Sequence, residues 1–278
     1  MKRFAPLAAV IALVFAAGAW AGPYSGPTDT AHAVDAAIPA ASPLFVEWAD
    51  AIDPARTAYA PRGSAAINPG GTNSLGDLDA DEIAAGAQPG YITVTFPSGI
   101  RNGAGPDFAV FENGFVFPSD PYLFAELAYV EVSSNGVDFA RFPSVSTNID
   151  WQGTFGQSFG GFDMTNVHNL AGKHASGFGT PFDLDDLASD PLVIGGQVDL
   201  AAIAFVKLVD IPGNGAFVDS SGSPILDTWL GTGGTAGYDF RLGVGHGVGV
   251  INAIPEPLSL SLAALGAICL AYSRRGVC

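Results

Sequence analysis

The chain has 278 residues and a formal net charge of −16 at pH 7, from 27 acidic and 11 basic side chains. The two end segments contain four of the basic residues, Lys2, Arg3, Arg274 and Arg275, and one of the acidic residues, Glu256. The body between them, residues 22–253, therefore carries a charge near −19. A body this acidic repels phosphate groups, which excludes nucleic acid and anionic lipid as its partners, but it attracts divalent cations.

The first 21 residues have the pattern of a secretory signal. Lys2 and Arg3 precede an apolar run from Phe4 to Ala17, and Ala19 and Ala21 are small residues at the two positions that a signal peptidase reads. The run is short for a permanent membrane span. We therefore predict cleavage after Ala21, which makes Gly22 the first residue of the exported chain; an uncut N-terminal anchor is the alternative.

The body has the sequence pattern of a mainly β protein. Short alternating or apolar runs are separated by glycine-rich turns, and no long stretch shows helical spacing. The predicted strands are Tyr91–Phe96, Asp107–Phe111, Tyr129–Ser133, Ala201–Asp210 and Val248–Asn252. The body contains no cysteine, since Cys269 and Cys278 lie beyond it, so its core alone must hold it. We predict a single β-sandwich of the jelly-roll or a related type. A β-helix is the alternative, although no fixed repeat supports it.

The segments around these strands are predicted to be turns, short helices and loops. Pro97-Ser98-Gly99 should end the first strand, and Asn113-Gly114 and Asn135-Gly136 are turn signals. The remaining predictions are helical turns at Asp79–Ala87 and Asp183–Leu187, a leading arm at Gly22–Pro43, and loops at Gly231–Gly237 and Gly243–Gly249. The last of these is also compatible with a strand whose glycines let another part of the chain approach closely.

Acidic residues indicate a possible Ca²⁺ site. Asp107 and Glu112 flank a strand that looks buried, and Asp219, Asp227 and Asp239 lie far downstream in turn-rich sequence. Calcium takes six to eight oxygen ligands, readily drawn from carboxylates and loop carbonyls. We predict a structural calcium site in which Asp107 and Glu112 bind the ion with help from the Asp219–Asp227 loop. The alternative is that each aspartate caps a helix or a turn.

A second acidic stretch, Asp77-Leu78-Asp79-Ala80-Asp81, spaces its carboxylates like a calcium loop. The sixth position is Glu82 where an EF-hand needs glycine, and the twelfth is Gln88 where it needs glutamate. The segment is therefore not an EF-hand, and we interpret it as a solvated acidic loop.

Enzyme motifs are weak in this chain. Gly156-Gln157-Ser158-Phe159-Gly160 matches the nucleophile elbow of α/β-hydrolases, but no strand–helix pattern surrounds it. The four histidines show no zinc spacing. We predict no enzymatic activity, with a secreted hydrolase using Ser158 as the weakest alternative. Stacking of sugar rings on Trp48, Trp151 or Trp229 is a further possibility, whose alternative is that these aromatics fill the core.

The C-terminal segment, residues 254–278, has three parts in a fixed order. Pro255, Glu256 and Pro257 come first, an apolar run from Leu258 to Ala271 follows, and Arg274 and Arg275 end it. The run is just long enough for a single transmembrane helix. Because basic residues are retained on the cytoplasmic side, the body would lie outside the membrane.

This order of motif, helix and basic cluster resembles the PEP-CTERM sorting signal of Gram-negative bacteria. The resemblance covers Ile254 to Arg275, and Pro255, Glu256 and Pro257 match the motif without departure. It implies an exosortase-type membrane protease as a partner, which cuts near the motif, and an inner-membrane intermediate on the way to the cell surface or extracellular matrix. A plain C-terminal membrane anchor is the alternative.

The body also resembles uncharacterised bacterial cell-surface proteins with galactose-binding-like jelly-roll folds. The segments that carry this resemblance are Gly105–Gly114, Val130–Phe139, Gly179–Leu184 and Asp219–Asp227. It implies the fold and no particular activity. The sequence as a whole predicts an exported surface or matrix protein with a structural or adhesive role, and extracellular polysaccharide is its second expected partner. A carbohydrate- or calcium-binding module is the alternative.

Overall fold

The structure is a computed structural model, and it describes residues 22–148, 160–228 and 237–255. The predicted signal segment and the C-terminal apolar run lie outside these ranges, as do Ser158, Trp151 and Trp229. Within them, no helix has the length and apolar character needed to cross a membrane.

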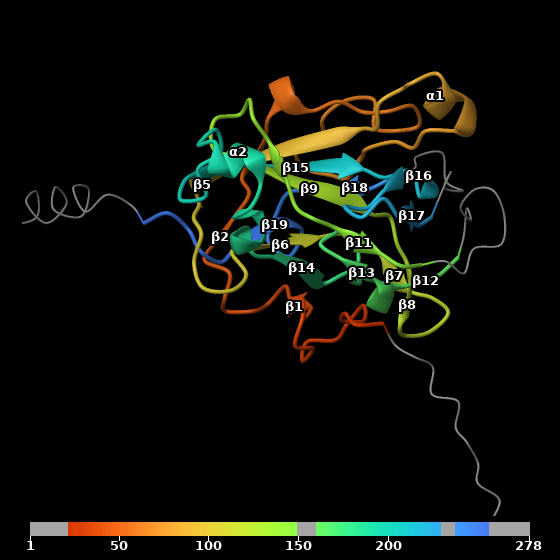
Figure 1. Cartoon of the computed structure of the whole chain (residues 1–278), viewed down its shortest axis with the longest axis horizontal. Helices are drawn as coiled ribbons and strands as arrows, with labels where there is room; N and C mark the ends of the chain where they lie inside the picture. The colour runs from red at the N-terminus through yellow and green to blue at the C-terminus, as the bar shows by residue number, and fades with distance from the viewer. Residues whose placement is uncertain (1–21, 149–159, 229–236, 256–278) are drawn as a thin grey trace, which may run out of the picture.

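The described chain is mainly β and forms several antiparallel sheets (Figure 1). The first five-stranded sheet has the order β1 (Ile38–Pro39), β14 (Phe178–Phe182), β6 (Phe108–Phe111), β19 (Gly247–Val250) and β2 (Glu47–Trp48). The second has the order β10 (Ala140–Arg141), β9 (Ala128–Ser133), β15 (Ile203–Asp210), β5 (Tyr91–Ile100) and β3 (Ala51–Ile52).

Smaller sheets lie at the margins of these two. β12 (Phe162–Asp163), β8 (Tyr122–Phe124) and β7 (Phe115–Val116) form a three-stranded sheet. Three strand pairs complete the set: β11 (Val145–Ser146) with β13 (Val167–His168), β16 (Asn214–Val218) with β17 (Pro224–Leu226), and β4 (Asn73–Ser74) with β18 (Asp239–Phe240).

The helices are short, and each begins after an aspartate whose side chain accepts a backbone N–H of the first turn. They are α1 (Ala80–Ala84), α2 (Pro191–Ile194) and the 3₁₀ turns η1 (Pro54–Arg56), η2 (Met164–Asn166) and η3 (Leu184–Leu187). An aspartate in this position satisfies an N–H group that the helix itself leaves without a partner. The helical turns predicted within 79–87 and 183–187 are confirmed, and Asp79 caps α1. The interpretation of Asp77–Asp81 as a solvated loop is wrong for Asp77, which is buried.

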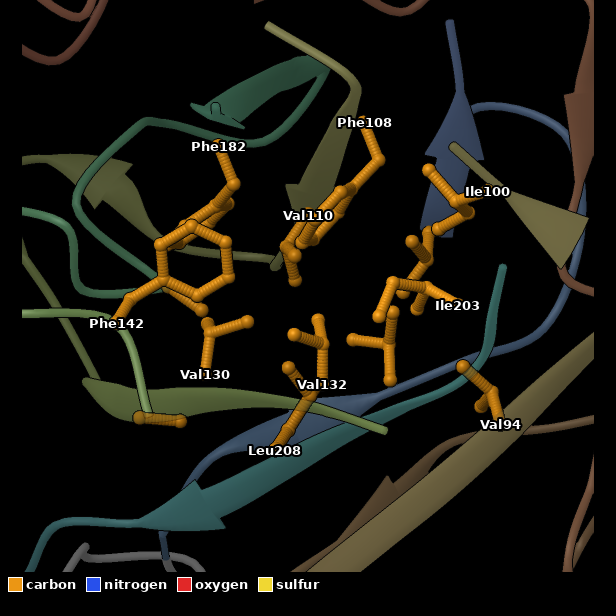
Figure 2. Packing of buried hydrophobic residues seen from close by; sticks show 14 of the residues in the cluster. Val94, Ile100, Phe108, Val110, Val130, Val132, Phe142, Phe182, Ile203 and Leu208 are labelled. Carbon is orange, nitrogen blue, oxygen red and sulfur yellow. The ribbon is translucent and has the colours of Figure 1, made fainter. Parts of the chain in front are cut away.

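The two five-stranded sheets share one hydrophobic core (Figure 2). Val94 of β5, Val132 of β9 and Leu208 of β15 belong to the same buried cluster as Phe108 of β6 and Phe182 of β14. In Figure 2 the valines and leucine of the second sheet point toward the aromatic side chains of the first. Burial of this apolar area is the main source of stability, at about 25 cal/mol for each Å².

All five predicted strands are present, as β5, β6, β9, β15 and β19. The predicted end of the first is wrong, because β5 continues through Pro97–Gly99 to Ile100. Phe205 pairs with Thr95 and Ile203 with Ile100, so residues 96–99 bulge out of the ladder. A bulge accommodates proline, which lacks an N–H, and Gly99 takes a φ of +83° there.

The two turn signals have different outcomes. Asn135-Gly136 joins β9 to its antiparallel neighbour β10, with Gly136 at a φ of +71°. Asn113-Gly114 closes no hairpin, because β6 pairs with β14 and β19 while β7 joins another sheet.

The loops near the ends of the body fold partly as predicted. The Gly22–Pro43 arm is mostly turns and ends in β1, which pairs with β14. Gly249 lies in β19, and a Cβ at that position would lie 2.7 Å from the Phe45 ring, so the predicted close approach is confirmed.

Candidate functional site

Asp107 has a structural role in this fold. Its Oδ1 accepts hydrogen bonds from the Gly103 backbone N–H and the Asn252 side-chain amide, both at 2.8 Å. Its Oδ2 accepts the Leu184 N–H, also at 2.8 Å. Asp107 therefore joins β6 to the start of η3 and to the segment after β19.

Asp219 is also occupied by local donors. One carboxylate oxygen accepts the N–H groups of Ser221 and Ser223, each at 2.8 Å, and the other accepts the Ser146 N–H at 2.9 Å. Within the described ranges, no three or more His, Cys, Asp or Glu side chains lie together as a group that could hold a metal. The predicted four-residue calcium site of Asp107, Glu112, Asp219 and Asp227 is therefore not formed, because backbone donors already use the oxygens of two of its members.

The other two predicted ligands belong to a larger group of acidic residues that we call the acidic cluster. It comprises Asp77, Glu112, Glu126, Asp210, Asp227 and Asp239. These residues come from the ends of strands or the turns beside them, for example Glu112 after β6, Asp210 at the end of β15 and Asp227 after β17. Electrostatic coupling connects them, since Glu126 interacts with Glu112, Asp239, Asp210 and Asp77, and Asp227 interacts with Asp77, Asp210 and Glu126.

Backbone contacts between distant segments bring the cluster together. The Leu75 N–H donates to the Tyr238 carbonyl at 2.9 Å, and the Ile211 N–H donates to the Leu127 carbonyl at 3.1 Å. Gly237 lies against Asp210, since a Cβ there would be 2.6 Å from the Asp210 Oδ1. Position 237 therefore requires glycine, because any side chain there would collide with the Asp210 carboxylate.

Three of these carboxylates share one geometry. In each, one oxygen accepts a backbone N–H: Asp210 Oδ1 from Tyr238 at 2.7 Å, Asp227 Oδ2 from Leu127 at 2.6 Å, and Glu112 Oε2 from Gly114. The second oxygens, Asp210 Oδ2, Asp227 Oδ1 and Glu112 Oε1, are buried and accept no hydrogen bond. A buried oxygen without a donor is costly, so this pattern calls for a ligand or a proton.

Arg241 and His246 line a small cavity together with Glu112 and Asp239, but neither basic side chain forms an ion pair with these acids in the described chain. Within the described residues, none of Glu112, Glu126, Asp210, Asp227 and Asp239 forms an ion pair with a lysine, arginine or histidine, whereas the ion pairs that do form involve other acids. Burial, followed by the charge of Glu112, raises the pKa of Glu126 to about 10. Burial also raises the pKa of Glu112 to about 8, and those of Asp210 and Asp227 well above their usual range.

These pKa values predict a pH-dependent stability. Glu112 and Glu126 have folded-state pKa values of about 8 and about 10, against 4.5 when unperturbed. Between these limits the unfolded chain binds fewer protons than the folded one, so the free energy of unfolding falls as the pH rises. In EDTA, the melting temperature is expected to fall by several degrees between about pH 5 and pH 9. Glu126→Gln should flatten this slope, and a wild-type melting temperature that climbs with pH would contradict the prediction.

No protein-family model, curated protein or solved structure matches this chain.

A second polar network holds the N-terminal arm to the body. Lys173, fully buried, donates to Asp35 at 2.6 Å, and the His168 Nδ1 lies 2.9 Å from the same Asp35 oxygen. His174 is also buried, with its Nε2 2.9 Å from the Ser25 Oγ and its Nδ1 3.0 Å from the Thr180 Oγ1. His174 thus has two structural partners in the described chain. Ser158, the proposed hydrolase nucleophile, lies outside the described residues.

A cavity of about 600 Å³ adjoins this network. Its polar lining includes His32, Asp35, His168, Asn169 and Asp183. The aromatic residues predicted to stack on sugars lie elsewhere: the Trp48 ring packs 4.9 Å from Phe45 and 5.3 Å from Phe111, which supports the core alternative for this residue. Trp151 and Trp229 lie outside the described residues.

The sequence predicted Glu112 and Asp227 as ligands and singled out Asp239 as a further acid, but it did not point to Glu126 or Asp210 as their neighbours. Asp210 was recognisable as an acidic residue at the end of a predicted central strand, the same position that Glu112 has after β6. Glu126 had no such signal, because it lies between apolar residues in the link from β8 to β9.

Proposed function

We propose that the chain is an exported protein of the bacterial cell surface or extracellular matrix, with a structural or adhesive role and no enzymatic activity. The observation that carries the proposal is the order Pro255-Glu256-Pro257, apolar run, Arg274-Arg275 at the end of the sequence. This order resembles an exosortase sorting signal, and the N-terminal Ala19-x-Ala21 site adds an export signal at the other end.

The fold of the body fits this role. Two five-stranded antiparallel sheets share one core without any disulfide, which supports the finer proposal of a β-sandwich of the jelly-roll class. A cysteine-free body does not depend on the redox state of its compartment. Its large negative charge keeps it soluble and away from anionic membranes after release.

Changing the motif should block processing. In an exosortase-containing Gram-negative host, a Pro255→Ala, Glu256→Ala, Pro257→Ala variant is expected to accumulate uncut in the inner membrane. The unmodified chain should appear at the surface or in the medium, cut near residue 255. Cell fractionation and mass spectrometry of the mature C-terminus measure both results.

The matched control is Arg274→Lys, Arg275→Lys, which keeps the positive charge beyond the apolar run and should sort normally. The proposal fails if the motif variant is processed as efficiently as the unmodified chain, or if the unmodified chain is found intact in the cytosol.

A carbohydrate-binding role is the second candidate, and the cavity beside the N-terminal arm favours it. Imidazole, carboxylate and amide groups line the cavity, and such groups hydrogen-bond sugar hydroxyls. A glycan array probed with the mature protein would show binding to one class of glycan. His32→Ala, which changes a half-buried residue of the lining, should weaken that binding, and an array without any bound glycan would remove this candidate.

A further inference from the structure

We propose that the acidic cluster binds one calcium ion, with Asp210 and Asp227 as fixed carboxylate ligands and Glu126 as a mobile third ligand. This site differs from the one predicted from the sequence, since it shares only Asp227 with it. It does not depend on the sorting signal, so it goes beyond the function proposed above.

Asp210 and Asp227 are oriented as metal ligands commonly are. Each is fully buried, and each uses one oxygen to accept a short hydrogen bond from a backbone N–H, Tyr238 for Asp210 and Leu127 for Asp227. This bond fixes the carboxylate while the other oxygen, Asp210 Oδ2 or Asp227 Oδ1, remains without a donor. Partners of this kind hold the first ligands of metal sites in place.

Glu126 lies next to these two aspartates and is less constrained. It precedes Leu127, whose N–H binds Asp227, and its charge couples to Asp210 and Asp227. Its side chain is partly exposed, and its carboxylate has no hydrogen bond among the described residues. As the side chains lie, no three acids converge on one point, so Glu126 must rotate toward the two aspartates to complete the site. A glutamate has the rotatable bonds for this movement.

The chemistry of the cluster selects a hard divalent cation. The ligands are carboxylate oxygens, and the buried hydroxyl of Thr228, which also lacks a hydrogen bond, offers a neutral oxygen beside Asp227. No cysteine lies in the body and no histidine belongs to the cluster, so zinc and copper are disfavoured. Calcium accepts six to eight oxygens in irregular geometry, whereas magnesium demands a near-ideal octahedron. Ligands from three separate segments of the chain suit calcium better.

Calcium titration of the full-length chain, purified in detergent and stripped with EDTA, tests the proposal. Isothermal calorimetry is expected to show one ion per chain, with a dissociation constant of about 10⁻⁴ M, as in extracellular modules. At one hundred times that constant, the melting temperature should rise by about 5–10 °C. Magnesium should bind at least tenfold more weakly, and equal or tighter magnesium binding would overturn the assignment to calcium.

Three isosteric variants locate the site. Asp210→Asn, Asp227→Asn and Glu126→Gln should each reduce calcium affinity at least tenfold and remove most of the gain in melting temperature. Each replaces a carboxyl group whose ionisation is opposed by burial with a neutral amide of the same shape, so in EDTA at pH 8 the variants should melt at or above the wild-type temperature, which shows that they fold. The matched control is Asp81→Asn, an exposed acid in α1, which should bind calcium like the wild type.

The proposal is overturned if calcium produces neither heat nor a thermal shift in the wild-type chain, or if the three variants bind as tightly as Asp81→Asn. Neither result would alter where the chain is sorted. Calorimetry and thermal melting thus test the calcium site, whereas cell fractionation and mass spectrometry test the export proposal.

Discussion

Replacing Asp35 with asparagine is expected to lower the free energy of unfolding by about 3–5 kcal/mol, because it leaves the buried Lys173 without its counterion. Lys173 is fully buried and donates to Asp35 at 2.6 Å, and the Asp35 side chain is 3% exposed. Asp35 has a φ of +51°, a conformation that asparagine tolerates well, so the main change is the loss of charge.

Both pKa values of this pair are lowered, which favours the neutral form of Lys173 but the ionised form of Asp35. Burial lowers the pKa of Lys173 to about 8, although Asp35 acts against this shift. Burial also opposes ionisation of Asp35, yet the His168 hydrogen bond and the Lys173 charge hold the pKa of that carboxyl well below its usual range. The short Lys173–Asp35 contact is decisive, and at pH 7 we expect both groups to be ionised. Removing the Asp35 charge then leaves the Lys173 ammonium buried without a counterion, so its desolvation is no longer compensated.

Urea denaturation at pH 7 measures this effect. The matched control is Asp29→Asn on the same arm. Among the residues that the structure describes, the Asp29 carboxylate accepts only the local Ala31 N–H and forms no ion pair. This substitution should cost less than about 1 kcal/mol. A loss below about 1 kcal/mol for Asp35→Asn would show that the arm does not depend on the ion pair.

The sequence predicted the long strands of the fold because their burial follows the chain. In β5, β9 and β15, apolar residues face the shared core, so alternating or continuous apolar runs identify them. The two-residue strands, such as β4 and β18, were not predictable, because they exist only where tertiary contacts bring two segments into register. The bulge in β5 was missed for a similar reason: Pro97-Ser98-Gly99 signals a turn unless a partner strand accommodates the extra residues.

The candidate site was only half predictable for a different reason. Composition indicated cation binding by carboxylates, but spacing along the chain does not reveal which acids meet. Backbone N–H groups donate hydrogen bonds to both carboxylate oxygens of Asp107 and of Asp219. Asp227, in contrast, has one buried oxygen that accepts no hydrogen bond. That distinction depends on the folded backbone. Glu126 and Asp210 join Asp227 only because the segment before β9 makes backbone hydrogen bonds to the residues that follow β15 and β17.

Phe108→Ala is the second substitution expected to have a large effect, about 3–5 kcal/mol of lost stability. Phe108 is fully buried in β6, and its ring stacks on Phe182 at 5.3 Å and meets the edge of Phe142 at 5.8 Å. Phe182 belongs to the same sheet as Phe108, but the Phe142 N–H donates to the Val130 carbonyl of β9 in the other sheet. The Phe108 ring therefore contacts side chains held by both sheets, as Figure 2 shows. Alanine would leave a cavity between two rigid layers that cannot easily collapse.

Urea denaturation of Phe108→Ala also tests whether the two sheets unfold together. If they form one cooperative unit, the midpoint should fall while the dependence of the free energy on urea stays unchanged. Phe115→Ala is the matched control, because Phe115 is 45% exposed and should cost only about 1 kcal/mol. A second transition, or a clearly smaller urea dependence in Phe108→Ala alone, would mean that the sheets unfold separately. The shared aromatic core would then not be the contact that makes the body a single unit.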